Sequence, residues 1–228
     1  MESGYRMTYG VDLVFCIDAT RSMDHILDTV KNNALSFYQD FQNVMESKHK
    51  RVSELRIRIV AFRDYRADKE KAMMVTDFFS FPEQAEDFHA CIRSISADGG
   101  GDDPEDGLEA VAYAMRSKWS TQAQKRRHII VVWSDEGTHA LGYGKTVANY
   151  PKNMARDFDE LTAWWGSKHF PGQMDESAKR LILFTPNEPG WSLIRDNWNN
   201  VIQYESSAGS GLRDCDYEQI LSAICNSI

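Results

Sequence analysis

The sequence predicts an α/β protein with a Rossmann-like, doubly wound fold: a mostly parallel six-stranded sheet, one antiparallel edge strand, and helices on both faces. Two apolar runs carry this prediction. Residues 11–17 and 129–133 are rich in Val, Ile, Leu and aromatic residues, which is typical of parallel strands that are covered on both faces. Segments with helical spacing of apolar residues lie between the strand-like runs, as expected when helices connect parallel strands.

The first part of the chain alternates strand-like and helix-like segments. A strand over about 10–17 is followed by helical spacing over 22–47, for which Ser22 is a natural N-cap. The alternating, β-branched segment 55–62 is expected to be a strand with one face partly wet. Residues 72–79 form the next strand. The charged turn between these two strands is too short for a crossover helix, so they are expected to pair as an antiparallel hairpin at the sheet edge.

The second part of the chain continues the same alternation. It is expected to contain a helix from Pro82 to about Ser96, a helix that begins near Pro104, a strand at 129–133, a helix at about 153–167, strands at 179–185 and 201–204, and a closing helix capped by Asp214. The long connection 136–152 leaves the end of the 129–133 strand, and connections of this length are usually functional or mobile.

Size and composition fit one domain over residues 1–228, with a core at about 10–226. The chain has 228 residues, of which 42% are hydrophobic and 11% aromatic, enough for a full core. The formal net charge of −8 argues against nucleic acid as a general partner. The sequence has no apolar stretch that approaches the length of a membrane span, so we expect no membrane association through such a segment.

The N-terminus and the cysteines favour a cytoplasmic location. The first residues lack the charged-then-apolar order of a signal peptide. The last two of the four cysteines, Cys215 and Cys225, are expected at either end of one helix, about 15 Å apart and too far to bridge. Because the sequence has neither a disulfide framework nor a Cys-x-x-Cys site, a reducing cytosol is the expected environment.

Oxygen-bearing side chains follow the first predicted strand at every second residue. Asp18, Thr20 and Ser22 lie where the strand ends and a long helix begins, which is the rim where open α/β sheets bind ligands. One carboxylate and two hydroxyls suit a small hard cation, Mg²⁺ before Ca²⁺. The alternative is a structural one, in which Ser22 caps the helix and Asp18 is a turn residue.

Two further acidic segments reach the same rim and favour the metal interpretation. The 129–133 strand leads into Asp135, and the loop 99–107 reads Gly-Gly-Gly-Asp-Asp-Pro-Glu-Asp-Gly. Together with Asp18-x-Thr20-x-Ser22, these segments resemble, in order and spacing, the metal-ion-dependent adhesion site of von Willebrand factor A-type (VWA) domains. The resemblance runs from about Val11 to the C-terminus, and the ordered set of motifs is far more specific than any single one.

The resemblance implies one divalent cation, Mg²⁺ or else Mn²⁺ or Ca²⁺, with a set of ligands from three loops: Asp18, Thr20, Ser22, Asp102 and Asp135. The family usually has Ser where this chain has Thr20, which keeps the hydroxyl. The second loop commonly donates a Thr, where this chain offers Asp102. Asp103 is the alternative in a register shifted by one residue, although Pro104 at the helix start makes Asp103 the natural N-cap.

Three carboxylates around one dication would leave the site formally negative. In adhesive members of the family, an under-neutralised metal attracts a carboxylate from the partner. That attraction is expected to be weaker here, and the role of the metal more structural. Asp64, at the end of the 55–62 strand, is either an acceptor behind the ligands or a turn residue. His139, near Asp135, is expected to be a loop residue rather than a ligand.

The resemblance implies a non-enzymatic, metal-dependent protein–protein interaction module, of the kind often found in intracellular, frequently bacterial, multi-protein assemblies. The partner would bind the metal-bearing face, near Ser22, Asp102, His139, Tyr143 and Trp191. Two alternatives stay open. One is a Mg²⁺-dependent phosphoryl-transfer enzyme, although the haloacid-dehalogenase type needs a second Asp where this chain has Thr20, and only Lys145 could supply a basic group. The other is a scaffold with a purely structural metal site.

Overall fold

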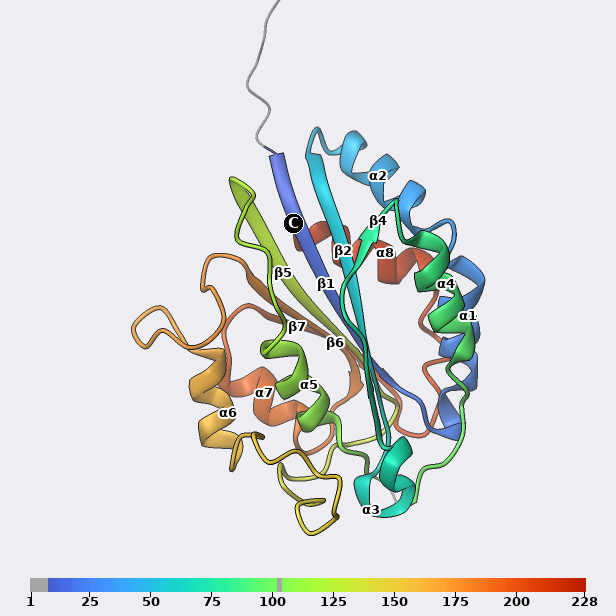
Figure 1. Cartoon of the computed structure of the whole chain (residues 1–228), viewed down its shortest axis with the longest axis vertical. Helices are drawn as coiled ribbons and strands as arrows, with labels where there is room; N and C mark the ends of the chain where they lie inside the picture. The colour runs from blue at the N-terminus through green and yellow to red at the C-terminus, as the bar shows by residue number, and fades with distance from the viewer. Residues whose placement is uncertain (1–7, 102–103) are drawn as a thin grey trace, which may run out of the picture.

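The computed structural model describes residues 8–101 and 104–228. Its core is one seven-stranded sheet in the order β3-β2-β1-β5-β6-β7, with β4 also paired to β2 (Figure 1). Strands β1, β2, β5, β6 and β7 are parallel, and β3 and β4 run antiparallel to β2. The strands are β1 (Thr8–Asp18), β2 (Arg51–Phe62), β3 (Met73–Val75), β4 (Phe79–Phe81), β5 (Lys125–Trp133), β6 (Lys179–Pro186) and β7 (Val201–Ser206).

Helices cover both faces of the sheet, each face with its own apolar cluster (Figure 1). One face packs against α1 (Asp24–Asn33), α2 (Phe37–Ser47), α4 (Ala85–Ser94) and α8 (Tyr217–Asn226). The other packs against α5 (Gly107–Met115), α6 (Phe158–Trp165) and α7 (Trp191–Asn197). The short helix α3 (Tyr65–Asp68) and the turn η1 (Arg21–Met23) lie beyond the strand ends. The predicted fold class, doubly wound and mostly parallel, is therefore confirmed.

The central strand β1 explains why the parallel strands end at one rim. It is buried on both faces, with Phe15 in one apolar cluster and Cys16 in the other, because successive side chains of a strand point to opposite faces. Asp18 pairs in register with Phe62 of β2, and Ile17 pairs with Trp133 of β5. The carboxyl ends of these strands therefore meet at one edge, the lower end of the sheet in Figure 1.

The sheet edge differs from the prediction in its number of strands. The predicted single strand at 72–79 is two three-residue strands, β3 and β4, so the sheet has seven strands rather than six. Between them the chain leaves the ladder at Thr76, whose hydroxyl accepts a hydrogen bond from the backbone N–H of Ile59 at 3.0 Å. The predicted antiparallel pairing with β2 is confirmed for both pieces.

Several helix boundaries also differ from the prediction. Helix α5 begins at Gly107 and not near Pro104, so its N-cap position is Asp106 and the predicted N-cap at Asp103 is wrong, and α6 begins at Phe158 and not near residue 153. The helical spacing over 22–47 is interrupted at residues 34–36, where the Ser36 hydroxyl bonds the carbonyl of Asn33 at 3.3 Å and competes with the helix ladder. The closing helix is capped by Asp216, which accepts the N–H of Gln219 at 2.8 Å, and not by Asp214. Cys215 therefore precedes α8 instead of lying on it. The described helices include none that is long and apolar enough to cross a membrane.

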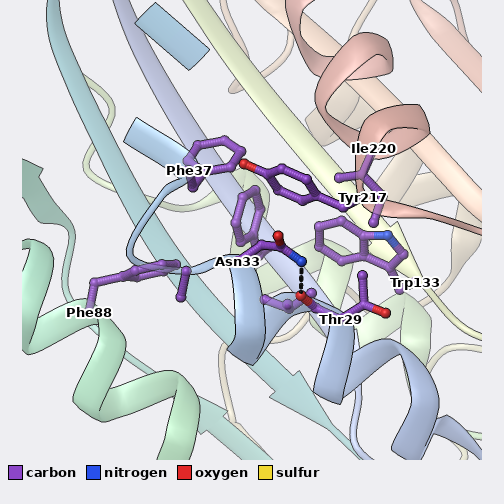
Figure 2. A pocket seen from close by; sticks show the side chains of 10 residues that line it. Thr29, Asn33, Phe37, Phe88, Trp133, Tyr217 and Ile220 are labelled. Carbon is purple, nitrogen blue, oxygen red and sulfur yellow. Dashed lines mark hydrogen bonds between the residues drawn. The ribbon is translucent and has the colours of Figure 1, made fainter. Parts of the chain in front are cut away.

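A small cavity remains in the core between α1, α8 and the sheet (Figure 2). It has room for roughly one water-sized molecule, about 20 Å³, and is lined mainly by apolar side chains such as Phe15, Val30 and Ile220. The indole Nε1 of Trp133, another lining residue, is buried and has no hydrogen-bond partner among the described residues. The packing under α1 therefore leaves a small space beside Phe15 of β1.

Candidate functional site

The side chains of Asp18 and Thr20 are joined at the end of β1. The Thr20 hydroxyl donates to Asp18 Oδ1 at 2.6 Å, and the Thr20 backbone N–H donates to the same oxygen at 3.0 Å. The other oxygen of Asp18 accepts the Ser134 hydroxyl at 2.8 Å. Asp18 is fully buried and Thr20 nearly so. The side chains that follow β1 at every second residue therefore bring their oxygens together. Neither Thr20 nor Ser22 caps a helix with its side chain, as the structural alternative had required of Ser22.

Ser22 and Asp135 connect the first strand end to the third. The Ser22 hydroxyl lies 3.4 Å from the Thr20 hydroxyl and donates to Asp135 Oδ1 at 2.8 Å. Asp135 Oδ2 accepts the backbone N–H of Gly211 at 2.8 Å. Asp135 is fully buried, whereas Ser22 is exposed. Four of the five predicted ligands, Asp18, Thr20, Ser22 and Asp135, thus form one continuous chain of hydrogen-bonding oxygens at the rim.

The fifth predicted ligand, Asp102, and its alternative, Asp103, lie outside the described residues. The choice between them therefore stays a prediction. Within residues 8–101 and 104–228, no three acidic, His or Cys side chains converge closely enough to form a metal-binding set on their own. The two hydroxyls are thus an essential part of any cation site formed by the described residues.

Glu105 is an acidic residue at this rim that the sequence prediction did not include. Its side chain is buried, and its Oε2 has no hydrogen-bond partner within the described part of the chain. A Cβ added at Gly100 would lie 3.1 Å from Glu105 Oε1 and 3.2 Å from the Thr20 methyl, so these groups surround one small space. The signal was present in the sequence, because Glu105 completes the Gly-Gly-Gly-Asp-x-Pro-Glu motif.

The rim concentrates negative charge in a buried setting. Burial raises the pKa of Asp18 to about 6, and the nearby charge of Asp135 adds to the shift against the hydrogen bonds from Thr20 and Ser134. Burial, and then the charge of Asp18, raise the pKa of Glu105 to about 10. No basic side chain in the described ranges lies within ion-pair distance of either group. Buried carboxylates without a basic partner are unfavourable, so a cation placed among them would be strongly attracted.

A second polar cluster lies beside the rim, around Asp64, Asp106 and His139. Asp64 caps α3 through Oδ1, which accepts the N–H groups of Arg66 and Ala67. Asp106 accepts the Tyr65 N–H at 2.6 Å through Oδ2, and its Oδ1 lies 3.2 Å from His139 Nδ1. Of the two roles predicted for Asp64, the structure shows that of a turn residue. Its Oδ2 also lies 3.9 Å from His139 Nδ1. This cluster fixes the loop that carries His139 against α3.

The aromatic residues predicted at the partner face are only partly accessible. Trp191 is fully buried, and its Nε1 donates to the carbonyl of Glu136 at 2.8 Å, so the prediction that it contacts a partner is wrong. His139 is also buried, and its ring stacks on Tyr143 at 3.8 Å. The other face of the half-buried Tyr143 is taken by the Arg66 guanidinium, whose Cζ lies 3.8 Å from the ring centroid. Ser22 and Arg66 are both exposed on this face.

The sequence-family model of the von Willebrand factor A domain matches residues 12–135 of the chain. The chain belongs to this family, as the sheet topology and the position of the rim also indicate. Within the matched segment, β1, β2 and β5 supply the strand ends at which Asp18, Asp64 and Asp135 lie.

The chain shares little sequence identity with the following proteins. The chain is similar to the alpha-protein kinase vwkA of Dictyostelium discoideum, with 23% identity over 141 residues, which are 62% of this chain and 21% of the kinase. It therefore spans about a fifth of that protein. In structure it resembles the pilus adhesin SpaC of Lactobacillus rhamnosus GG, with a TM-score of 0.53, 12% identity, and coverage of 95% of this chain and 30% of the adhesin. The open conformation of SpaC gives a TM-score of 0.52 at the same identity and coverage. These likenesses show the fold.

Proposed function

We propose that the chain is a non-enzymatic protein-interaction module whose binding face is organised by one divalent cation. The observation that carries this proposal is the chain of oxygens from Asp18 through Thr20 and Ser22 to Asp135. These groups come from two strand ends far apart in sequence, and they are of the type that Mg²⁺ prefers, with Mn²⁺ and Ca²⁺ as alternatives. Membership of the family and the likeness to a protein described as an adhesin support an interaction role.

The chemistry of the rim fits such a cation. Asp18 and Asp135 would contribute negative charge, the hydroxyls of Thr20 and Ser22 would contribute neutral oxygens, and Asp102 would add the carboxylate of the second loop. Glu105 would act directly or from behind the ligands, since its buried Oε2 lacks a hydrogen bond in the described residues. The cation would supply the positive charge that no side chain provides there. The hydroxyl protons, which now point to carboxylates, would turn away from it.

The partner is proposed to dock around the cation rather than to ligate it. The rim already holds Asp18, Asp135 and Glu105, so their carboxylates together would more than balance the charge of a dication, which would then attract an acidic side chain only weakly. Exposed groups around the rim, Ser22 and Arg66 in particular, would then provide the contacts, together with the half-exposed Tyr143 that packs against Arg66. The free cysteines, of which Cys16, Cys215 and Cys225 are buried, support the proposal that the module works in the cytosol.

Calorimetric titration with Mg²⁺ and thermal melts with and without the cation test the proposal. We expect one site per chain and a higher melting temperature with Mg²⁺, because a ligand that binds only the folded state stabilises it. Asp18→Ala should abolish both effects. Asp24→Ala is the matched control, since Asp24 is an exposed acid on α1 nearby. Unchanged Mg²⁺ binding in Asp18→Ala would reject the site.

A metal-dependent interaction should also be lost on chelation. A partner captured with Mg²⁺, identified and purified, should bind the wild-type chain but not Asp18→Ala. Binding that survives both EDTA and Asp18→Ala would favour the alternative, a scaffold whose metal is purely structural. A phosphoryl-transfer enzyme is disfavoured because Thr20, at the position of its acid–base Asp, is bonded to Asp18. Hydrolysis of a phosphate ester by the chain, lost in Asp18→Ala, would favour the enzyme instead.

A further inference from the structure

A second pocket lies on the sheet face beside α5, away from the metal rim. It has a volume of about 260 Å³ and is lined by two residues of β2, two from the β3–β4 connection and two from the segment that follows α5: Arg56, Arg58, Asp77, Phe78, Arg116 and Lys118. Arg58 precedes the rim end of β2, Phe62, by four residues, about 13 Å along a strand. The pocket is therefore separate from the proposed cation site.

Four of the six lining residues are basic, and one is acidic. This balance contrasts with the chain as a whole, which has a net charge of −8. Two acids beside the pocket are paired with Arg56: Asp12, at 2.7 Å, and Glu54, at 3.9 Å. With Asp12, Glu54 and Asp77 counted against the four basic groups, the pocket still has an excess of one positive charge. Such a local excess on an acidic protein attracts anions into the pocket.

Arg58 is a half-buried guanidinium without an acidic partner. Its Nε donates to the carbonyl of Thr76 at 2.7 Å, and its Nη1 donates to the Ser117 hydroxyl at 2.7 Å. No carboxylate of the described chain lies within ion-pair distance of it. Burial accordingly lowers its pKa. Both bonds hold the guanidinium plane in place and leave Nη2 without a hydrogen-bond partner among the residues described.

Arg56 is held rigidly beside it. Its Nε and Nη2 make a bidentate pair with Asp12, at 2.8 and 2.7 Å, and Nη2 also reaches the carbonyl of Lys118 at 3.1 Å. The guanidinium Cζ lies 4.5 Å from the centroid of the Phe78 ring. Because residues two apart on a strand share a face, Arg56 and Arg58 present their remaining donors to the same pocket, about 7 Å apart at the backbone.

We propose that this pocket binds a phosphomonoester dianion. Two fixed guanidinium groups match the oxygens of a phosphoryl group, and the surplus of basic side chains in the lining favours an anion. A carboxylate has two oxygens rather than three and a single negative charge, so it would engage fewer of these donors. Lys118, exposed at the mouth of the pocket, would add a mobile cation. The dianion is either free phosphate or a phosphorylated side chain of another protein, since both present the same group.

Amide NMR titration of the full chain with inorganic phosphate, at constant ionic strength against chloride, tests the proposal. We expect saturable shifts at Arg58, at Ser117 and at Asp77. Arg58→Gln should weaken binding by about tenfold or more, because it removes a positive charge and a charge-assisted donor. Lys118→Glu should weaken it as well, and it provides a second test because Lys118 is exposed and its side chain holds no structure. Arg93→Gln on the exposed side of α4 removes an equal charge and should leave the affinity unchanged.

Two outcomes would overturn the proposal. In the first, the amide chemical shifts grow with phosphate concentration without saturating, or they spread evenly over the basic residues. In the second, the affinity is equal in the wild type, Arg58→Gln and Lys118→Glu. A peptide that contains phosphoserine, beside its unphosphorylated form, separates the two sources. Tighter binding of the phosphopeptide than of phosphate identifies a phosphorylated partner, and equal binding identifies the free anion. Binding of both peptide forms alike would show that the phosphoryl group is not recognised.

Discussion

Ser22 and Asp135 are joined by a 2.8 Å hydrogen bond across 113 residues of sequence. The bond connects a helix start to a strand end, and Asp135 uses its second oxygen to hold the backbone of Gly211. A single carboxylate therefore ties three loops together at the rim. Since only Ser22 of these groups is exposed, it is the point at which the site can be altered with the least effect on the core.

Ser22→Ala is the first prediction. It removes one of the two hydroxyl oxygens of the proposed cation site. The Mg²⁺ affinity should fall by about tenfold, the lower end of the loss seen when a group that supports a metal site is removed. The free energy of unfolding without Mg²⁺ should fall by about 1 to 3 kcal/mol, because the buried Asp135 carboxylate loses one of its hydrogen-bond donors. Calorimetry and urea unfolding measure the two quantities. Ser36→Ala, at another exposed serine with one backbone hydrogen bond, should leave the affinity intact; an equal loss there would show a non-specific effect.

Gly211→Ala is predicted to disrupt the rim through the backbone. Gly211 has a φ of +64°, and an added Cβ would lie 2.4 Å from the Ser22 carbonyl oxygen. Gly209 is the matched control, because its φ is +67° but its Cβ would meet only the flexible end of Glu136, at 3.2 Å. Gly209→Ala should cost about 1 kcal/mol from the left-handed conformation alone, and Gly211→Ala clearly more, with weaker Mg²⁺ binding. Equal unfolding free energies would contradict the close approach.

The third prediction concerns pH and Glu109 of α5. Glu109 is fully buried and holds the long loop through the Gly142 N–H, at 2.9 Å, and the Tyr150 hydroxyl, at 2.8 Å. Burial, and then the charge of Asp106, raise its pKa from 4.5 to about 7. The folded chain thus binds more protons than the unfolded chain between these values, so the free energy of unfolding falls as pH rises from 4.5 to 7, by up to roughly 3 kcal/mol.

Glu109→Gln should remove this contribution to the pH dependence. The amide can still accept both hydrogen bonds but does not ionise. Urea unfolding at pH 5 and pH 8 should show a smaller loss of stability in Glu109→Gln than in the wild type. Glu86→Gln, an exposed acid on α4, should keep the wild-type difference. An unchanged difference in Glu109→Gln would mean that Glu109 is ionised throughout this range.

The cavity under α1 leads to a fourth prediction. Val30→Ile adds one methylene to a residue that lines the cavity of about 20 Å³ shown in Figure 2. It should raise the free energy of unfolding by up to about 0.8 kcal/mol, the value of one buried methylene. Val44→Ile on α2 makes the same chemical change outside the cavity and should give little or no gain. Thermal melts of both variants compare them directly, and a destabilised Val30→Ile would show that the cavity is too narrow.

Much of the fold could be predicted from the sequence because β1 and β5 are continuous apolar runs that end in acids. The same pattern placed Asp18 and Asp135 at one rim. The edge strand could not be predicted in detail, because the interruption at Thr76 depends on a side-chain bond to β2 rather than on local propensity. The cap of α8 was wrong for a similar reason, since Asp214 and Asp216 are equally good N-caps in sequence and only the path from Leu212 selects one.

Burial of individual side chains was the weakest part of the prediction. Trp191 looked like a surface aromatic in a rim loop, yet it fills the space above Gly107, where an added Cβ would lie 2.4 Å from its ring. That space exists only because residue 107 is a glycine on a different segment. Glu105 was missed because its place beside Thr20 brings together residues that are far apart in the sequence. Both are long-range packing relationships, which a single sequence does not encode locally.

The central position of β1 has a consequence for the order of folding. Its neighbours β2 and β5 begin at Arg51 and Lys125. Both edges of the first strand are therefore paired only when a segment beyond the middle of the sequence has joined the sheet. The group that fixes Asp135, Gly211, comes later still. Because contacts between distant residues form late, a cation at the rim would act mainly after the folding barrier has been crossed. It would then slow unfolding far more than it speeds folding, making the finished fold long-lived rather than helping it to form.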